Sequence, residues 1–104
     1  MKSFRFHPDA RTELREAVRY LESQQSRLGR RFRALVGDAL QVIRANPQTG
    51  ILDGGFRLKS VRPFSYWVVF VERTDDIWII AVHHGHRDHT YWQKRFDKLA
   101  SEEG

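Results

Sequence analysis

Apolar residues recur along this chain with two different periods, and the change of period separates predicted strands from predicted helices. Residues 2–7 alternate between polar and apolar, with Phe4 and Phe6 on one face, which predicts a short strand. After Pro8–Asp9 the apolar residues follow helical spacing instead, which predicts an amphipathic helix. Its apolar stripe is Ala10, Leu14, Ala17, Val18 and Leu21, and a second stripe is Arg11, Arg15 and Arg19.

A second helix is predicted after Gly29, because apolar residues again recur every three or four positions. Its apolar face is Phe32, Leu35, Val36, Ala39, Leu40 and Ile43. Asn46–Pro47 ends it, since proline cannot continue a helix and disfavours helical geometry in the residue before it. The short connector at residues 27–29 predicts an antiparallel helix hairpin. Residues 48–55, which include three glycines, are predicted to be a loop.

Three strands are predicted in the second half of the chain, joined as a meander. They cover Phe56–Val61, Ser65–Glu72 and Ile77–His84, with a turn at residues 73–76. Residues 88–99 are expected to form a short C-terminal helix or an irregular tail. The whole chain, residues 1–104, is therefore interpreted as one α+β domain of order β-α-α-β-β-β, with an N-terminal helix hairpin on one face of an antiparallel sheet.

The last two predicted strands do not alternate, because residues 66–71 and 77–82 are apolar on both faces. An antiparallel sheet with one wet face should alternate, so the second face must be covered as well. The cover is either the C-terminal segment, with Tyr91, Trp92 and Phe96, or another protein, or both.

Composition favours an acidic partner and excludes several kinds of site. The net charge is +5, and arginine far outnumbers lysine, whose point charge suits phosphates and carboxylates less well than the guanidinium fork does. Nucleic acid, a nucleic-acid machine or an acidic protein are the expected partners, and the alternative is that the charge provides only solubility. The absence of cysteine excludes disulfides and thiolate metal sites. No apolar run reaches the roughly 18 residues of a membrane span, and the alternating N-terminus is unlike a signal peptide, so we expect a cytoplasmic protein.

Polar and aromatic residues are expected to converge at one end of the sheet. A turn centred near residues 74–75 pairs the start of the middle strand with the end of the last, which places Tyr66 near His83. The expected cluster is Arg62, Tyr66, His83, His84, His86 and Arg87. Arg57 is about five residues from Arg62, or roughly 16 Å along a strand. It is therefore expected to reach the same face of the sheet as the cluster but not the same point on it.

Two kinds of chemistry are conceivable for this cluster, metal binding and RNA cleavage. His83, His84, His86 and His89 do not match a helical zinc spacing, and successive strand residues point to opposite faces, so neither a metal nor another cofactor is expected. RNA cleavage without metal would need cations for the phosphorane charge and a proton carrier. Arg62 and Arg87 could supply the cations, and Tyr91 or a histidine the proton carrier.

Short motifs recur in a characteristic order along nearly the whole chain: Phe6–Ala10, Glu13–Leu14, Glu16–Ala17, Gly29 with Phe32, Asn46–Pro47, Arg57, Arg62–Tyr66, Ala81–Arg87, Tyr91–Trp92 and Arg95. Together they resemble the bacterial RelE/ParE toxin superfamily of type II toxin–antitoxin systems, and most closely its ParE-like, plasmid stabilisation branch. The resemblance implies the β-α-α-β-β-β fold. It also implies a cognate antitoxin that is partly disordered, folds on the toxin and forms a hetero-oligomer with it.

Two activities share this fold: RelE-like members cleave mRNA on the ribosome, and ParE-like members inhibit DNA gyrase by binding. In the ribonuclease branch an arginine follows the middle-strand tyrosine, whereas Trp67 follows Tyr66 here, and Leu58 and Ser60 stand where that branch has paired lysines. The resemblance therefore favours gyrase inhibition. The alternatives are a ribonuclease using Arg62, Arg87 and Tyr91, and an inert relative that only binds antitoxin. The candidate target-binding residues are Arg57, Arg62, Tyr66, His83, Arg87, Tyr91, Trp92 and Arg95.

Overall fold

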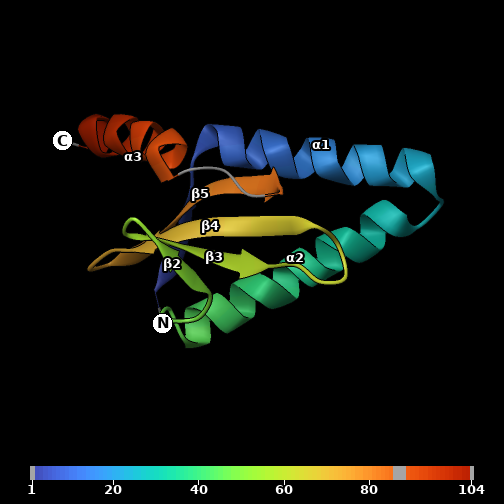
Figure 1. The fold of residues 1–104 in the computed structure, drawn as a ribbon, viewed down its shortest axis with the longest axis horizontal. Coiled ribbons are helices and arrows are strands. Elements are labelled where there is room, and N and C mark those ends of the chain that lie inside the picture. Colours follow the sequence, from blue (N-terminus) through green and yellow to red (C-terminus); the bar gives the residue numbers. More distant parts are fainter. Residues whose placement is uncertain (1, 86–88, 104) are drawn as a thin grey trace.

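The computed structural model describes residues 2–85 and 89–103, and it has the predicted α+β architecture (Figure 1). The elements in chain order are β1 (Ser3–Phe6), α1 (Pro8–Gln24), α2 (Leu28–Ala45), β2 (Ile51–Asp53), β3 (Phe56–Ser60), β4 (Tyr66–Glu72), β5 (Asp76–His84) and α3 (His89–Glu103). The C-terminal segment is thus a helix of 15 residues, the first of the two expected forms.

The five strands form one sheet in the order β1-β5-β4-β3-β2. β3, β4 and β5 make the predicted antiparallel meander, with β2 added antiparallel beside β3. β1 pairs with β5 in parallel, with Phe4 opposite Ile77, so the sheet is mixed rather than wholly antiparallel. The physical reason is that β1 is not joined to its neighbour by a hairpin turn, because the chain passes through both long helices and the meander before it returns as β5.

The strand β2 lies inside the region that was predicted to be a loop. It has only three residues, and Ile51 and Leu52 are both exposed, so no apolar alternation marks it in the sequence. Gly50 lets it approach β3, because a Cβ at Gly50 would lie 2.6 Å from the carbonyl oxygen of Leu58. Close backbone packing at a glycine therefore forms this edge strand.

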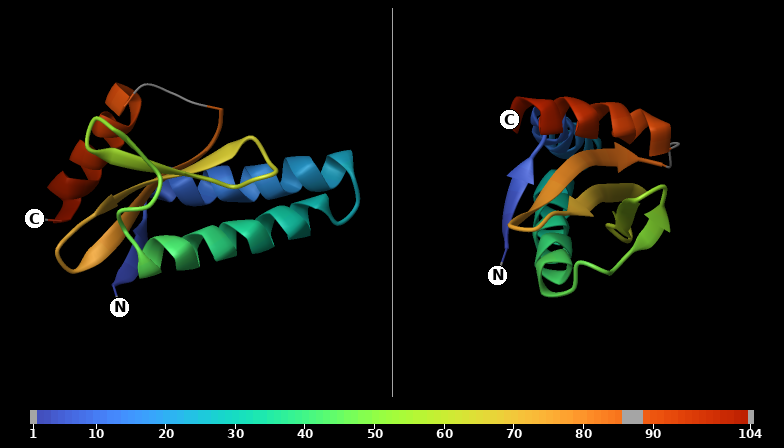
Figure 2. Two further views of the ribbon diagram at one scale, coloured as in Figure 1. Left: turned by 60° about the horizontal axis from the view of Figure 1, so that its bottom comes forward. Right: turned by 90° about the vertical axis from the view of Figure 1, so that its left-hand side faces the viewer.

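The helix hairpin covers one face of the sheet, and the two helices run side by side in opposite directions (Figures 1 and 2). Both predicted apolar stripes pack into the larger core, where Ala10, Phe32 and Ile43 are fully buried against Ile77 and Ile79. The connector has the predicted length of three residues but covers 25–27 instead of 27–29, because α1 continues to Gln24 and α2 already begins at Leu28. The hairpin end lies beyond the ends of the strands (Figure 1).

The helix α3 covers the second face of the sheet (Figure 2). This cover explains why β4 and β5 are apolar on both faces. Trp92 and Leu99 are buried against Trp78 and Ile80, and the ring of Phe96 lies 5.4 Å from that of Trp78. The C-terminal segment is therefore the cover of this face.

Candidate functional site

A β-bulge sets which side chains meet at the end of the sheet. Phe70 of β4 is opposite Ile79, but Val69, the residue before it, is opposite Ala81. Ile80 is therefore an extra residue in β5, without a partner of its own in β4. Ile80 and Ala81 consequently both pack on the α3 face. The bulge shifts the register by one, and Tyr66 is paired with His84 instead of the predicted His83.

The two histidines at the end of β5 lie on opposite faces of the sheet. The ring of His84 meets Tyr66 edge-on at 5.0 Å, and Tyr66 lies 4.8 Å from Phe32 on the helix-hairpin side. Burial raises the pKa of the Tyr66 hydroxyl, with the nearby Tyr20 adding to the shift. This tyrosine is therefore a neutral, packed residue at neutral pH.

On the α3 face, His83 contacts two aromatic residues of the helix. Its ring is stacked on Tyr91 and lies edge-on to Trp92, with both centroids 6.5 Å away. Trp92 is fully buried, whereas Tyr91 is 39% exposed. Tyr91 is thus the residue of this group that a partner could reach.

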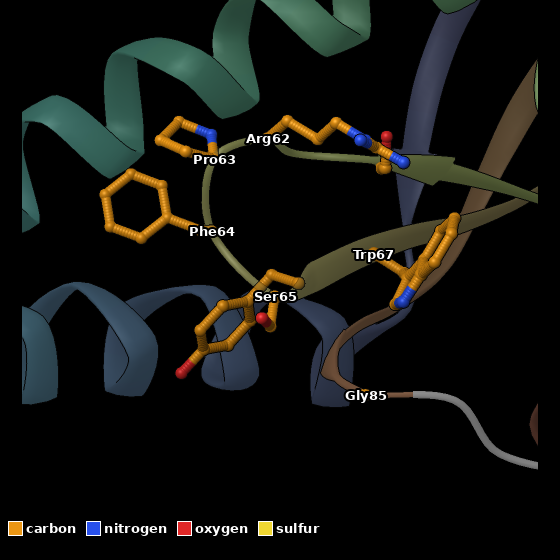
Figure 3. A pocket seen from close by; sticks show the side chains of 8 residues that line it. Arg62, Pro63, Phe64, Ser65, Trp67 and Gly85 are labelled. Carbon is orange, nitrogen blue, oxygen red and sulfur yellow. The ribbon is translucent and has the colours of Figure 1, made fainter.

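Arg62 lies at the rim of a hollow of about 500 Å³ between the β3–β4 loop and the end of β5 (Figure 3). The hollow is lined by Ser60, Arg62, Pro63, Phe64, Ser65, Tyr66, Trp67 and Gly85. A hydrogen bond from Gly85 N–H to the Ser65 carbonyl, 3.0 Å long, holds the loop against β5. Within residues 2–85 and 89–103, the exposed Arg62 guanidinium has no hydrogen bond or ion pair, so its charge is available to a ligand.

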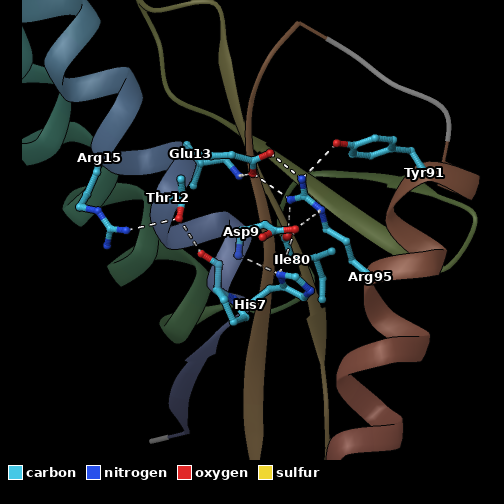
Figure 4. A network of polar contacts seen from close by, with 10 residues as sticks. His7, Asp9, Thr12, Glu13, Arg15, Ile80, Tyr91 and Arg95 are labelled. Carbon is cyan, nitrogen blue, oxygen red and sulfur yellow. Dashed lines mark hydrogen bonds and ion pairs between the residues drawn. The ribbon is translucent and has the colours of Figure 1, made fainter.

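Arg95 is instead occupied by contacts inside the protein (Figure 4). Its guanidinium forms a bidentate pair with Glu13, with Nη2–Oε2 and Nη1–Oε1 distances of 2.7 and 2.9 Å. It also donates to the Tyr91 hydroxyl over 3.1 Å. Burial acts to lower the pKa of Arg95, but the hydrogen bonds and charge of Glu13 outweigh it and raise the pKa. The guanidinium is therefore permanently charged and already paired.

The Glu13–Arg95 pair lies at an edge of β5 that β1 does not cover. The last backbone bond from the β1 side is from His7 N–H to the Ile79 carbonyl, 2.9 Å long. Beyond it, Arg95 donates to the Ile80 carbonyl over 3.1 Å, and Glu13 accepts from Val82 N–H over 3.1 Å. The ion pair thus satisfies backbone groups that a longer β1 would have bonded.

The remaining predicted residues fall in different places. Arg57 donates to the carbonyl and side-chain oxygens of Gln48 at 2.8 and 2.9 Å, so it holds the segment before β2 and is not part of the cluster. Arg87 and His86 lie outside the described residues. The structure therefore brings Arg62, Tyr66 and His84 to the same end of the sheet, with His83 and Tyr91 on its other face.

Sequence reasoning missed Glu13 as a residue of this region. Its signal is its position on α1, since Ala10, Glu13 and Ala17 follow one another at three- and four-residue spacing and share a face. An acidic residue on that buried face needs a buried partner, which Arg95 supplies. The prediction that Arg95 binds the target is not reflected in its contacts, because its donors bond Glu13 and the Ile80 carbonyl inside the protein.

Among the residues that the structure describes, no group of three or more His, Cys, Asp or Glu side chains is placed to hold a metal ion. No helix formed by these residues is sufficiently long and apolar to cross a membrane.

Comparisons with known proteins identify the family. The family model of the ParE toxin of the type II toxin–antitoxin system ParDE matches residues 4–89. Among solved structures, a chain of the chromosomal ParDE system from P. aeruginosa has the same fold, with a TM-score of 0.60 and 15% identity over 83% of this chain and 98% of that chain. No curated protein matches the sequence. Because the family model spans most of the sequence, this chain belongs to the ParE toxin family of type II toxin–antitoxin systems.

Proposed function

We propose that this protein is a bacterial, cytoplasmic toxin that inhibits DNA gyrase by binding to it and is neutralised by a cognate antitoxin. The observation that carries the proposal is the composition of the hollow beside Arg62. Trp67 of β4 lines it together with serine hydroxyls, so one free cation lies beside a large aromatic side chain. Aromatic and arginine side chains are the residues that anchor protein–protein interfaces.

The engagement of the neighbouring groups also favours binding over catalysis. Cleavage of a phosphodiester needs a proton carrier and cations that converge on one phosphate. The Tyr91 hydroxyl accepts a hydrogen bond from Arg95, and Arg95 is paired with Glu13. Arg95 thus fixes α3 against α1, and the Tyr91 hydroxyl is bonded to that same guanidinium within the helix, which supports the proposal that this surface recognises a protein.

A cognate antitoxin is the second partner of the proposal. The exposed side chains of Ile51 and Leu52, at 57% and 61%, lie on an edge strand whose outer side is unpaired within the described sheet. An extended segment can add to such an edge through backbone hydrogen bonds. The net charge of +5 suits an acidic segment of that kind.

The test is a supercoiling assay with purified gyrase and relaxed plasmid. The wild-type chain should inhibit supercoiling at micromolar concentration, and Arg62→Gln should weaken inhibition about tenfold or more, as loss of a central interface residue does. Lys59→Gln removes a neighbouring cation from β3 outside the hollow and should leave inhibition unchanged. Full supercoiling at every wild-type concentration would exclude the proposal.

A second candidate function, ribosome-dependent mRNA cleavage, is favoured by one observation, the unpaired Arg62 guanidinium beside a hollow of about 500 Å³. Primer extension on translated mRNA separates the two. Cuts linked to codons, lost in Arg62→Gln, would assign the site to cleavage instead of gyrase inhibition. Intact mRNA together with inhibited supercoiling is the result that the proposal predicts.

A further inference from the structure

The positive charge of the helix hairpin is concentrated in one stretch. Residues 15–33 hold six arginines, no lysine and two glutamates. Their net charge of +4, six minus two, compares with +5 for the whole chain. This concentration lies at the hairpin end that extends beyond the strands (Figure 1).

Three of these arginines surround a single hollow between the two helices. Arg15 and Arg19 reach it from α1, and Arg33 reaches it from α2. The hollow has a volume of about 450 Å³, and Val18, Glu22 and Ser23 complete its lining. We call Arg15, Arg19 and Arg33 the arginine face; all three side chains are exposed.

The three arginines outnumber Glu22, the one acidic residue that lines this hollow, so the face keeps a net positive charge. Both carboxylate oxygens of Glu22 accept backbone N–H groups at the start of α2, from Arg27 at 2.8 Å and Gly29 at 3.0 Å. Those bonds lower the pKa of Glu22. Glu16 lines a different hollow, beside Tyr66. Among the described residues, Arg19 and Arg33 have no hydrogen bond or ion pair, and Arg15 has only a 3.3 Å bond to the Thr12 hydroxyl.

The spacing of the arginines matches a row of phosphates. Positions 15 and 19 are one helical turn apart, which is about 6 Å at 1.5 Å per residue. Phosphates of one DNA strand recur regularly, with an advance of about 3.4 Å per nucleotide along the helix axis, so two arginines one helical turn apart can each reach a neighbouring phosphate. Arg33 lies across the hollow on the second helix, where it can reach the same backbone from the other side.

The chemistry of the lining favours a nucleic-acid backbone over an acidic peptide. A folded peptide is anchored by apolar side chains in pockets, but Val18 is the only apolar residue that lines this hollow. Guanidinium forks bind phosphate oxygens in pairs without needing such an anchor. We propose that the arginine face binds the phosphate backbone of duplex DNA, without sequence preference.

The proposed DNA binding does not require gyrase, although a toxin bound to gyrase would also be close to the DNA that gyrase holds. Fluorescence anisotropy with a labelled 25-base-pair duplex, measured on the isolated protein between about 50 and 200 mM salt, tests it. With three phosphate contacts, the slope of log K against log salt should be about −2.7. Duplexes of unrelated sequence should bind equally.

The decisive variant is Arg15→Gln/Arg19→Gln/Arg33→Gln. It should lose most of the affinity at 50 mM salt and most of the salt slope, since each phosphate contact contributes about 0.9 to that slope. The matched control, Lys59→Gln/Lys94→Gln/Lys98→Gln, removes the same charge elsewhere and should keep the slope. Circular dichroism shows whether the triple variant folds. If it does not fold, the single variant Arg19→Gln replaces it, and the expected change of the salt slope is then about one third as large.

Three results would overturn the proposal. One is the absence of any anisotropy change with duplex DNA at 50 mM salt. Another is an equal loss of affinity in the lysine variant, which would mean that only net charge matters. A third is binding of poly-glutamate, but not DNA, to the same arginines, which would assign the face to an acidic protein. None of these results depends on inhibition of gyrase.

Discussion

Glu13 and Arg95, 82 residues apart in the sequence, together complete the edge of β5 where β1 stops. Their side chains form two hydrogen bonds with each other, and each also bonds one backbone group of β5, at Val82 and Ile80. The pair therefore connects α1, β5 and α3 at a single point. Because α3 covers the second face of the sheet, this connection helps to hold that cover in place.

Replacing Arg95 by alanine should lower the free energy of unfolding by about 2–4 kcal/mol, because Glu13 would remain partly buried without its partner. The two side chains are only 12% and 23% exposed, so water cannot fully replace the lost contacts. Urea denaturation followed by circular dichroism measures the change. Arg95→Lys should give a smaller loss, since it keeps the charge but not the bidentate geometry.

The control for that experiment is Gln93→Ala on the same helix. Gln93 donates to Asp97 at 2.9 Å in an exposed pair, so its loss should cost less than about 0.5 kcal/mol. If Arg95→Ala cost no more than this control, the structural role given to the ion pair would be wrong.

His7 should make stability depend on pH. Its side chain is buried, and Nδ1 accepts a hydrogen bond from Asp9 N–H, 3.0 Å long, at the start of α1, which requires the neutral imidazole. Burial lowers the pKa of His7 below 6.5; Arg95 and Lys98 lower it further, while Asp9 and Glu102 oppose the shift. The unfolded chain therefore binds the proton more readily, so stability should be full above pH 6.5 and fall as pH drops through the lowered pKa.

The substitution His7→Asn isolates this effect from the other four histidines. Asparagine can cap a helix through its side-chain oxygen but does not titrate. Denaturation of both proteins at pH 7.5 and pH 5 should show a smaller loss of stability in the variant. Equal losses would assign the pH dependence to other groups.

Gly29 and Gly37, both in α2, should respond oppositely to alanine. A Cβ at Gly29 would collide with the carbonyl oxygen of Val18, whereas a Cβ at Gly37 meets no atom within 4 Å. Gly29→Ala should therefore destabilise by about 1–3 kcal/mol through overpacking. Gly37→Ala should stabilise by up to about 1 kcal/mol through helix propensity. Thermal denaturation of the two variants gives the comparison, and matching shifts of Tm would contradict the packing of the hairpin.

Alanine substitutions of the neighbouring residues Trp92 and Tyr91 on α3 should both destabilise the protein, but by different amounts. Trp92 is fully buried, so Trp92→Ala should cost about 3–5 kcal/mol and loosen the helix from the sheet. Tyr91 is 39% exposed, and Tyr91→Ala should cost about 1 kcal/mol, mainly the hydrogen bond with Arg95. Hydrogen exchange of the β5 amides would report the loosening, and it should increase only in the Trp92 variant.

The sequence predicted the long periodic elements well, because an apolar stripe of many residues leaves one way to bury it. Both stripes of the hairpin and the continuous apolar run of β5 are in the core. The sequence did not predict β2, because its three residues are exposed or half-exposed and show no alternation of apolar and polar positions. The parallel pairing of β1 with β5 depends on a long-range arrangement that no local pattern encodes.

The candidate site was predictable in outline but not in detail. The hairpin turn correctly placed Tyr66 at the end of β5, but the bulge at Ile80 exchanged one histidine partner for the other. The role of Arg95 also escaped prediction, because a guanidinium bound to Glu13 and one offered to a partner look the same in a sequence. The unpaired Arg62 remains the cation most open to a partner among the predicted, described site residues.

Inhibition of purified gyrase by the purified chain is the most direct test of the proposed function. A titration of the protein into a supercoiling reaction, without antitoxin, should stop supercoiling at micromolar concentration, and a stoichiometric amount of cognate antitoxin should restore it. Unchanged supercoiling at concentrations where the protein is folded, by circular dichroism, would contradict the account.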